Sequence, residues 1–151
     1  MAVDDALGII ETQVALLMRL GEATRRSTGL TPHRALDRSA YVILRHLQAS
    51  GALNVSALAA RLNLDGSTVT RQVTALENDG LIERQRDPRD GRGIVIAPTE
   101  LGLKQVNNVR KARHDVYDRV LRDWNEADRE ALASILERFN GALESYMRES
   151  R

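Results

Sequence analysis

The chain has 151 residues, the size of one domain, and its 42% apolar and 28% charged residues are ordinary for a globular protein. Aromatic residues make up only 3% and cysteine is absent, which predicts an aliphatic core and excludes disulfides, thiolate–metal sites and cysteine redox sensing. The formal net charge of +1 argues against strong, non-specific binding to nucleic acid through bulk charge.

The N-terminal third predicts two helices separated by a loop. Residues 4–25 repeat apolar positions at three- and four-residue spacing, and Asp4 and Asp5 suit the positive end of such a helix. Its single narrow stripe consists of Leu7, Ile10, Val14, Leu17 and Gly21. Residues 27–36, with Gly29 and Pro32, predict a loop. A second helix follows over about 37–49, and its apolar face is Ala40, Ile43, Leu44 and Leu47.

The middle of the chain predicts a helix-turn-helix with a wing. A short helix begins near Asn54 or Ser56 and ends at residues 63–65, and a second helix runs over 66–77 with Asp65 as its N-cap. Gly80 closes it. Two short β-rich runs then flank the segment DPRDGR, residues 87–92, which predicts a hairpin because Asp-Gly tolerates the positive φ of tight turns.

The last third predicts two more helices. Thr99 is the expected cap of a helix that reaches about Asp123, and Asn125 that of the final helix. The apolar stripe of the final helix is Leu132, Ile135, Leu136, Phe139, Leu143 and Tyr146. A helix over 99–123 spans roughly 35 Å at about 1.5 Å per residue, longer than a globule of this size requires. Packing against a second subunit is therefore favoured over an intrachain bundle.

These elements define a mainly α fold with a small β-hairpin wing: a winged helix-turn-helix domain flanked by long dimerisation helices. We expect residues 1–50 and 99–151 to form the helical dimerisation region. Residues 51–98 are expected to form the DNA-binding lobe, all within a single integrated domain. Residues 51–99 hold six arginines and six acidic residues, so a basic surface has to come from their placement.

The outer face of the helix over 66–77 suits a DNA major groove. At about 100° per residue, its inward positions are Val69, Val73 and Leu76. The opposite positions are Ser67, Thr70, Arg71 and Thr74, a small, hydroxyl-rich face with one arginine for guanine. Solvated helix faces usually carry Lys and Glu, and this one has none before Glu77. The N–H groups of Ser67 and Thr68, in the first turn, are expected to bind phosphate.

The hairpin tip places arginines beside acids. A solvated turn is the simplest interpretation of an isolated hairpin, but this one follows a groove-reading helix. Its arginines, Arg89 and Arg92, are therefore expected to reach the neighbouring minor groove, whose narrow, negative slot suits arginine. Asp90 is expected to hold the guanidinium of Arg92 in place.

The motifs of the middle third resemble the MarR family of bacterial transcription regulators. The matching segments are Leu58-Ala59, Ser67–Arg71, Leu76–Arg84, Asp87–Arg92 and Thr99–Gly102. The resemblance implies a triangular homodimer that binds double-stranded DNA at a palindromic operator, usually as a repressor. It also implies release of DNA when a small, often phenolic or aromatic effector binds between the dimerisation and DNA-binding parts.

Carried over by motif, Arg92 resembles the minor-groove arginine of the family and Asp90 its orienting acid. The residues that resemble the major-groove and phosphate set are Ser67, Thr68, Thr70 and Arg71. The chain departs from the family at Pro98, where leucine is usual before Thr-Glu, and a slight shift of the junction between wing and helix is expected there. Peroxide-sensing members use a cysteine, so that mechanism is excluded.

Other classes of function are disfavoured. No nucleophile elbow, H-E-x-x-H or P-loop is present, so no enzyme, metal site or cofactor is expected, and the adjacent His114 and Asp115 are interpreted as surface residues. A winged-helix protein-interaction module without DNA contact remains the alternative, because the middle region is electrically neutral. The acidic N-terminus and the lack of a long apolar run predict a cytoplasmic protein without a membrane partner.

An effector pocket, if the resemblance holds, should include side chains of the first two helices. The candidate ligand-binding residues are Arg19, Tyr41 and His46. Each also has a plain structural explanation: Arg19 as a surface charge, Tyr41 as core at the helix junction, and His46 as a hydrogen-bonded neighbour. The sequence does not identify the effector, the operator or the target genes.

Overall fold

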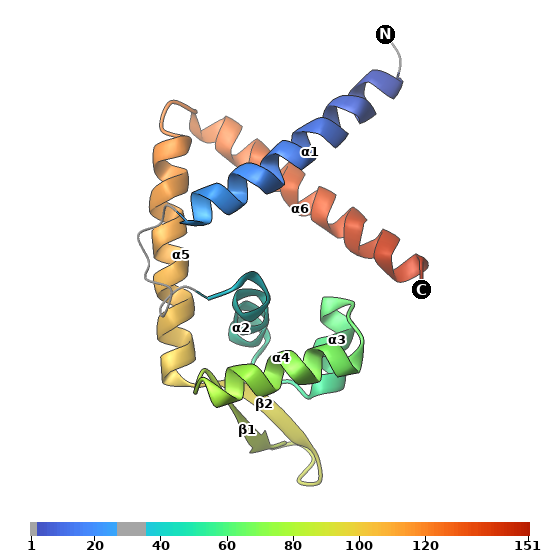
Figure 1. Ribbon diagram of the computed structural model, residues 1–151, viewed down its shortest axis with the longest axis vertical. Coiled ribbons are helices and arrows are strands. Elements are labelled where there is room, and N and C mark those ends of the chain that lie inside the picture. Colours follow the sequence, from blue (N-terminus) through green and yellow to red (C-terminus); the bar gives the residue numbers. More distant parts are fainter. Residues whose placement is uncertain (1–2, 27–35) are drawn as a thin grey trace.

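The computed structural model describes residues 3–26 and 36–151 and has the predicted architecture, mainly helical with one β-hairpin (Figure 1). The elements are α1 (Val3–Arg26), α2 (Arg38–Ser50), α3 (Val55–Leu62), α4 (Gly66–Asn78), β1 (Ile82–Arg86), β2 (Ile94–Pro98), α5 (Glu100–Val120) and α6 (Glu126–Glu149). The predicted loop, with Gly29 and Pro32, lies outside the described residues except for its end at Leu36. None of the described helices is long and apolar enough to cross a membrane.

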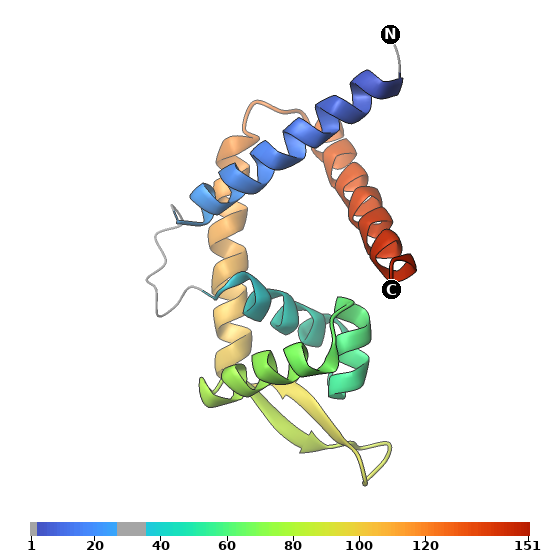
Figure 2. The same ribbon diagram turned by 45° about the vertical axis from the view of Figure 1, so that its right-hand side comes forward.

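The hydrophobic core lies where α2, α3, α4, the start of α5 and the hairpin meet (Figure 2). It is aliphatic, as the composition predicted. The largest fully buried side chains are Ile43, Leu44, Leu47, Leu58, Val69, Val73, Ile82, Ile96 and Val106. Each such side chain contributes about 1.5–3 kcal/mol relative to an exposed one. Among the described residues no polar or charged residue is buried, so apolar burial dominates the stability of this core.

Helix caps set the bounds of the helix-turn-helix. The Asn54 side chain caps α3 by accepting the N–H of Ala57 at 2.7 Å. α3 ends at Asn63, whose φ of 54° is the left-handed conformation that asparagine tolerates. Asp65 then caps α4, as predicted. The two helices are therefore separated by a turn of only three residues.

The wing is a two-stranded antiparallel hairpin with Arg84 opposite Ile96. An isolated hairpin of this size is marginal in water, so it needs anchoring. Leu53 supplies part of this by exchanging two backbone hydrogen bonds with Ile96, at 3.1 and 2.7 Å. Ile82, Val95 and Ile96 add to it by burying their side chains. The base of the wing is thus part of the core, while its tip projects from it.

The wing joins α5 through a close backbone contact. Thr99 caps α5, as predicted: its Oγ1 accepts the N–H of Gly102 at 3.1 Å and donates to the carbonyl of Gly80 at 2.6 Å. A Cβ on Gly102 would lie 2.1 Å from the carbonyl oxygen of Leu81, so this helical position requires glycine. Pro98 is the last residue of β2 and leaves the Thr99 cap intact.

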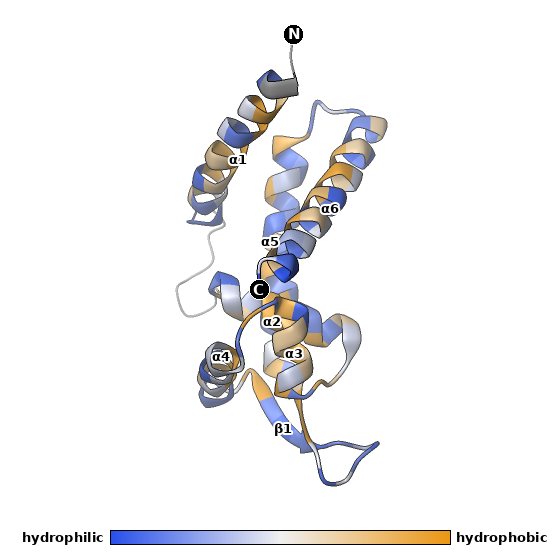
Figure 3. Ribbon diagram, turned by 90° about the vertical axis from the view of Figure 1, so that its right-hand side faces the viewer, coloured by the Kyte–Doolittle hydropathy of each residue, from blue (hydrophilic) through white to orange (hydrophobic). Residues whose placement is uncertain are grey.

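The terminal helices stand apart from this core. Figure 3 shows α1 and α6 standing apart from each other, with α5 behind them. Neither helix has a buried residue among those described, and the stripes predicted from periodicity are largely exposed. The exposed apolar residues include Leu7, Ile10 and Leu17 on α1, and Ile135, Leu143 and Tyr146 on α6. Among the described residues, most of these two faces is left without an apolar partner.

The corner between α5 and α6 comes earlier than predicted. α5 ends at Val120 instead of near Asp123, because residues 121–124 form a turn in which the Trp124 N–H donates to the carbonyl of Leu121 at 3.0 Å. Arg129 ties the corner together by donating from Nη2 to the same carbonyl at 2.7 Å. Trp124, the single tryptophan of the chain, is 46% exposed there.

Candidate nucleic-acid interface

α4 presents the outer face that the sequence predicted. Its inner positions Val69, Val73 and Leu76 are buried, whereas Ser67, Thr70, Arg71 and Thr74 are exposed. The Thr74 hydroxyl donates to the carbonyl of Thr70 at 2.8 Å, so its methyl group and lone pairs are what remain for an external partner. Arg71 forms no ion pair with any described residue. This face therefore offers one unpaired guanidinium among small side chains, the size and chemistry that a major groove accepts.

The N-terminus of α4 differs from the prediction. Thr68 was expected to offer a free N–H to phosphate, but that N–H donates to Asp65 Oδ1 at 2.7 Å. The Ser67 hydroxyl donates to the same oxygen at 3.0 Å. The prediction missed that a capping aspartate occupies the donors it stabilises. Only the N–H groups of Gly66 and Ser67 remain for a phosphate at this end, beside a carboxylate that repels it.

The cap is ionised through almost the whole pH range. Hydrogen bonds from the hydroxyl and N–H of Thr68, and from the Ser67 hydroxyl, lower the pKa of Asp65 to about 2. Because the folded pKa is lower than the unfolded one, the ionised cap stabilises the fold above about pH 4, and this contribution disappears as the pH falls from about 4 to about 2.

We expect Asp65→Asn to remove this pH dependence. Asparagine also accepts a hydrogen bond as an N-cap, but it does not titrate. The melting temperature of the wild type should therefore exceed that of Asp65→Asn above pH 4, and the difference should shrink towards pH 2. Parallel thermal melts followed by circular dichroism measure it. A difference that stays constant over this range would contradict the assignment.

Two aspartates shape the wing tip through its backbone. Asp87 Oδ1 accepts the N–H of Arg89 at 2.8 Å, and Asp90 Oδ1 accepts the N–H of Arg92 at 3.1 Å. The Gly93 N–H donates to the carbonyl of Asp90 at 2.9 Å. These local turns replace the predicted one: the described glycines with positive φ lie outside the wing tip. The prediction of a hairpin was confirmed, and that of a positive φ at Asp-Gly was wrong.

The acids of the wing hold the chain and not the arginine side chains. The predicted contact between the Asp90 carboxylate and the Arg92 guanidinium is not formed, because that carboxylate accepts the backbone N–H instead. The side chains of Arg89 and Arg92 are exposed, and neither has an ion-pair partner among the described residues. Both guanidinium groups are therefore available to an external anion.

Placement leaves the arginines of the electrically neutral lobe more available to an external partner than its acids. Of its six arginines only Arg84 is paired, with Glu77. The others are exposed and without an ion pair to the described residues: Arg61, Arg71, Arg86, Arg89 and Arg92. Three of the six acids, in contrast, are engaged with backbone N–H groups as caps or turn formers: Asp65, Asp87 and Asp90. The positive charges are thus the more available ones, as binding to phosphates requires.

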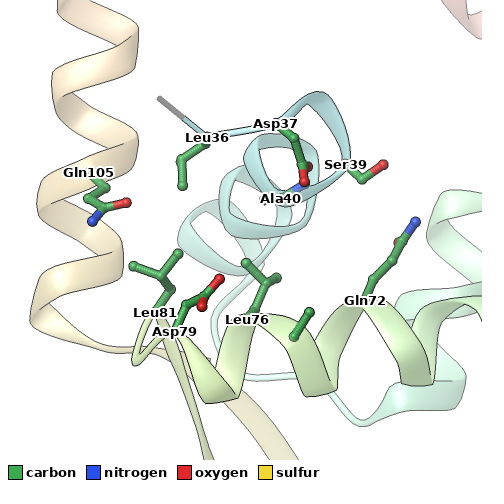
Figure 4. A pocket seen from close by; sticks show the side chains of 10 residues that line it. Leu36, Asp37, Ser39, Ala40, Gln72, Leu76, Asp79, Leu81 and Gln105 are labelled. Atoms are coloured by element: carbon green, nitrogen blue, oxygen red, sulfur yellow. The ribbon is translucent and has the colours of Figure 1, made fainter. Parts of the chain in front are cut away.

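A pocket of about 480 Å³ lies behind α4, on the side away from its outer face (Figure 4). It is formed by the start of α2, the inner side of α4, Leu81 and α5. Its polar lining residues are Asp37, Ser39, Gln72, Asp79 and Gln105. Gln72 Oε1 is buried without a hydrogen-bond partner. This pocket was not predicted from the sequence, where its one signal was a polar residue, Gln72, between the apolar positions of α4.

A second pocket, of about 300 Å³, lies between α1, α2 and α5. Tyr41 lines it, and the guanidinium of Arg113 lies over the Tyr41 ring at 4.5 Å from its centre. Arg19 and His46 line neither pocket: Arg19 is exposed on α1 and His46 is half-buried in α2. The three predicted ligand residues are therefore not brought together. Within the described residues no group of His, Cys, Asp and Glu is arranged to hold a metal ion.

A helix-turn-helix followed at once by an arginine-tipped hairpin defines a winged helix-turn-helix DNA-binding protein. Residues 36–94 match the model of the MarR family. The HTH-type transcriptional regulator YxaD of Bacillus subtilis is 37% identical over 108 residues, which cover 72% of this chain and 76% of that protein. The chain belongs to the MarR family of transcriptional regulators, as the sequence motifs predicted.

Other proteins similar to this chain are also transcriptional regulators. The HTH-type transcriptional repressor IacR of Pseudomonas putida is 26% identical over 117 residues, which cover 78% of this chain and 70% of that protein. The structure of the PcaV transcriptional regulator from Streptomyces coelicolor, solved in complex with its natural ligand, matches with a TM-score of 0.68 at 22% identity. That match covers 95% of this chain and 99% of PcaV and shows that the two share a fold.

Proposed function

We propose that this regulator is a repressor that binds a palindromic operator as a homodimer and releases it when a small effector binds. The observation that carries the DNA-binding part is the unpaired Arg71 on the outer face of α4, next to a wing whose Arg89 and Arg92 are also unpaired. A helix in the major groove and an arginine-bearing wing in the adjacent minor groove would use all three. The relative IacR is a repressor, which supports repression, and not activation, as the effect on transcription.

The exposed stripes of α1 and α6 support the homodimer. Apolar faces of this extent on two long helices are stabilised by a symmetric partner. In this proposal the dimerisation region consists of α1, the distal half of α5 and α6. We move α2 from that region, where the sequence placed it, to the DNA-binding lobe, because Ile43, Leu44 and Leu47 are buried in the lobe's core.

The two pockets support regulation by an effector. Both touch α2 and α5, and one also touches the recognition helix, so an occupant of either would contact elements that position α4. An aromatic effector would suit the pocket with Tyr41 and Arg113, which together offer a ring and a cation. PcaV, which shares the fold, was solved with its natural ligand. Thermal melts of the protein with a panel of small aromatic acids test this part.

Selection of bound fragments from a random DNA pool tests the proposal as a whole. The selected sequence should be an inverted repeat with half-site centres one helical turn apart, because two recognition helices are related by a dyad. Its affinity should fall with salt, since phosphate contacts release counterions. A protein-interaction module would select no sequence and would not retard DNA from its own promoter region in a gel.

Arg71→Ala should weaken binding to the selected site by roughly 1–3 kcal/mol and relax the preference at one base pair of each half-site. The reason is that Arg71 is the one long donor on the outer face of α4. A repeated selection with the variant measures both effects. If the variant selects the same sequence with the same stringency, Arg71 does not read a base.

Arg92→Ala should weaken operator binding and leave the melting temperature within about 1–2 °C of the wild type, because the side chain is exposed at the wing tip. The loss should be larger on operators with A·T-rich flanks, where the narrow minor groove concentrates negative potential. Asp90→Ala should give a smaller loss, because it loosens the backbone that carries Arg92. Titrations on both flank types measure this, with Arg122→Ala, exposed at the distant corner, as the control.

A further inference from the structure

We propose that Glu77 and Arg84 are a positioning pair that holds the wing at a fixed angle to the recognition helix. Arg84 Nε lies 2.9 Å from Glu77 Oε2, joining β1 to the last turn of α4. Among the described residues it is the one ion pair between the hairpin and the rest of the chain. The inference rests on the proposed DNA binding, in which α4 and the wing engage neighbouring grooves together.

The position of Arg84 along the strand explains why a polar tie is used there. Backbone hydrogen bonds link α4 to the start of β1. The N–H of Gly80 donates to the backbone carbonyl of Glu77 at 3.0 Å, and the N–H of Leu81 donates to the backbone carbonyl of Leu76 at 2.9 Å. The next residue, Ile82, is buried, but every later residue of β1 is exposed. Arg84 shares a strand face with Ile82, because side chains alternate along a strand. Along β1 towards the wing tip, Arg84 is therefore the last residue that contacts α4 through its side chain.

The wing tip amplifies any change at this point. From Arg84 to Arg89 the chain runs about 16 Å at about 3.3 Å per residue. A tilt of about 10° at the pair would move the tip by about 3 Å. Hydrogen bonds to phosphate or base atoms need distances of about 2.7–3.2 Å, so this shift would separate the tip arginines from their contacts.

The exposure of the Glu77–Arg84 pair indicates that it positions the wing and adds little to the stability of the fold. The side chains of Arg84 and Glu77 are 38% and 39% exposed, and ion pairs of this kind contribute little to stability. Loss of the pair should therefore leave the melting temperature unchanged and appear in DNA binding. It should appear, moreover, only in the part of the binding that depends on the wing.

The test uses Glu77→Gln and Arg84→Gln, with Asp118→Asn as the matched control. Asp118 forms the comparable exposed pair with Arg129 at the distant α5–α6 corner, at 3.3 Å. Each of these two variants should bind the selected operator about fivefold more weakly, a fraction of the loss expected for Arg92→Ala. The double variant should bind no more weakly than either single variant, because both remove one interaction. Asp118→Asn should bind as the wild type does.

Double-mutant cycles identify the mechanism. Glu77→Gln should have no further effect on an Arg89→Ala/Arg92→Ala background, where neither tip arginine remains to be positioned, and its full effect on an Arg71→Ala background. Equal losses on both backgrounds would mean that the pair acts elsewhere and would overturn the inference. A loss for Arg84→Gln without one for Glu77→Gln would mean that Arg84 itself contacts DNA, which also overturns it. A wild type that binds no DNA would instead refute the proposed function.

Discussion

Gly102→Ala should destabilise the protein more than any other single methyl group added to a glycine of the described chain. The added Cβ would lie 2.1 Å from the carbonyl oxygen of Leu81 and 3.3 Å from a methyl group of Leu44. Both neighbours belong to the buried junction of α5, the wing and α2, so the backbone itself has to move. We expect a loss of about 3 kcal/mol, at the upper end for overpacking, and a clearly lower melting temperature.

Gly141→Ala is the matched control for this prediction. Gly141 is also inside a helix, α6, but a Cβ there would meet nothing within 4 Å. Alanine should therefore stabilise this helix by roughly 0.5–1 kcal/mol. Chemical denaturation of the two variants beside the wild type measures both changes. Equal effects would mean that the close approach at Gly102 is relieved without cost.

The second large effect is expected from charges placed on the apolar stripe of α6. Ile135→Asp combined with Leu143→Asp should convert the proposed dimer to a monomer, because both side chains are exposed in the single chain and would be buried in the interface. The monomer can occupy only one half-site, so operator affinity should fall by roughly a hundredfold or more. Light scattering and operator titrations measure the two results.

The control for the stripe is Glu137→Gln, an exposed position on the opposite side of α6. It should leave mass and affinity unchanged. The lobe's core contains no residue of α6, so the doubly substituted chain should retain the circular dichroism of a helical protein. A doubly substituted protein that still scatters light as a dimer at micromolar concentration would place the interface on other elements.

Local signals in the sequence predicted most of the fold. Each capping residue acts within three positions of its own, so Asp65, Thr99 and Asn125 located the starts of α4, α5 and α6 without any tertiary information. The apolar face of α4 was equally local. The assignment of α2 to one of the two regions was not local, because its buried face fits either a dimer interface or a lobe core. Its packing against α4 and β2 supports our proposal that it belongs to the lobe.

The exposure of the proposed DNA-binding residues was predicted from the sequence, but the partners of the neighbouring acids were not. The sequence placed Arg71, Arg89 and Arg92 on the exposed side, where the structure has them. It assigned the neighbouring acids to the arginine side chains, whereas Asp87 and Asp90 accept backbone N–H groups. An aspartate can reach either partner, and the choice depends on loop geometry that periodicity does not contain. The pockets were not predicted for a related reason, because the residues that line them come from helices distant in sequence.

The single tryptophan gives the protein a built-in spectroscopic probe. Trp124 sits at the corner of α5 and α6, half-exposed next to Leu132 and Ile135 and remote from the wing. With no second indole in the chain, the emission spectrum has one source. The wavelength of the emission maximum therefore reports the solvent exposure of that one corner. The measurement needs no label and no engineered residue, and it comes from the end of the molecule opposite to the wing, which we propose binds DNA.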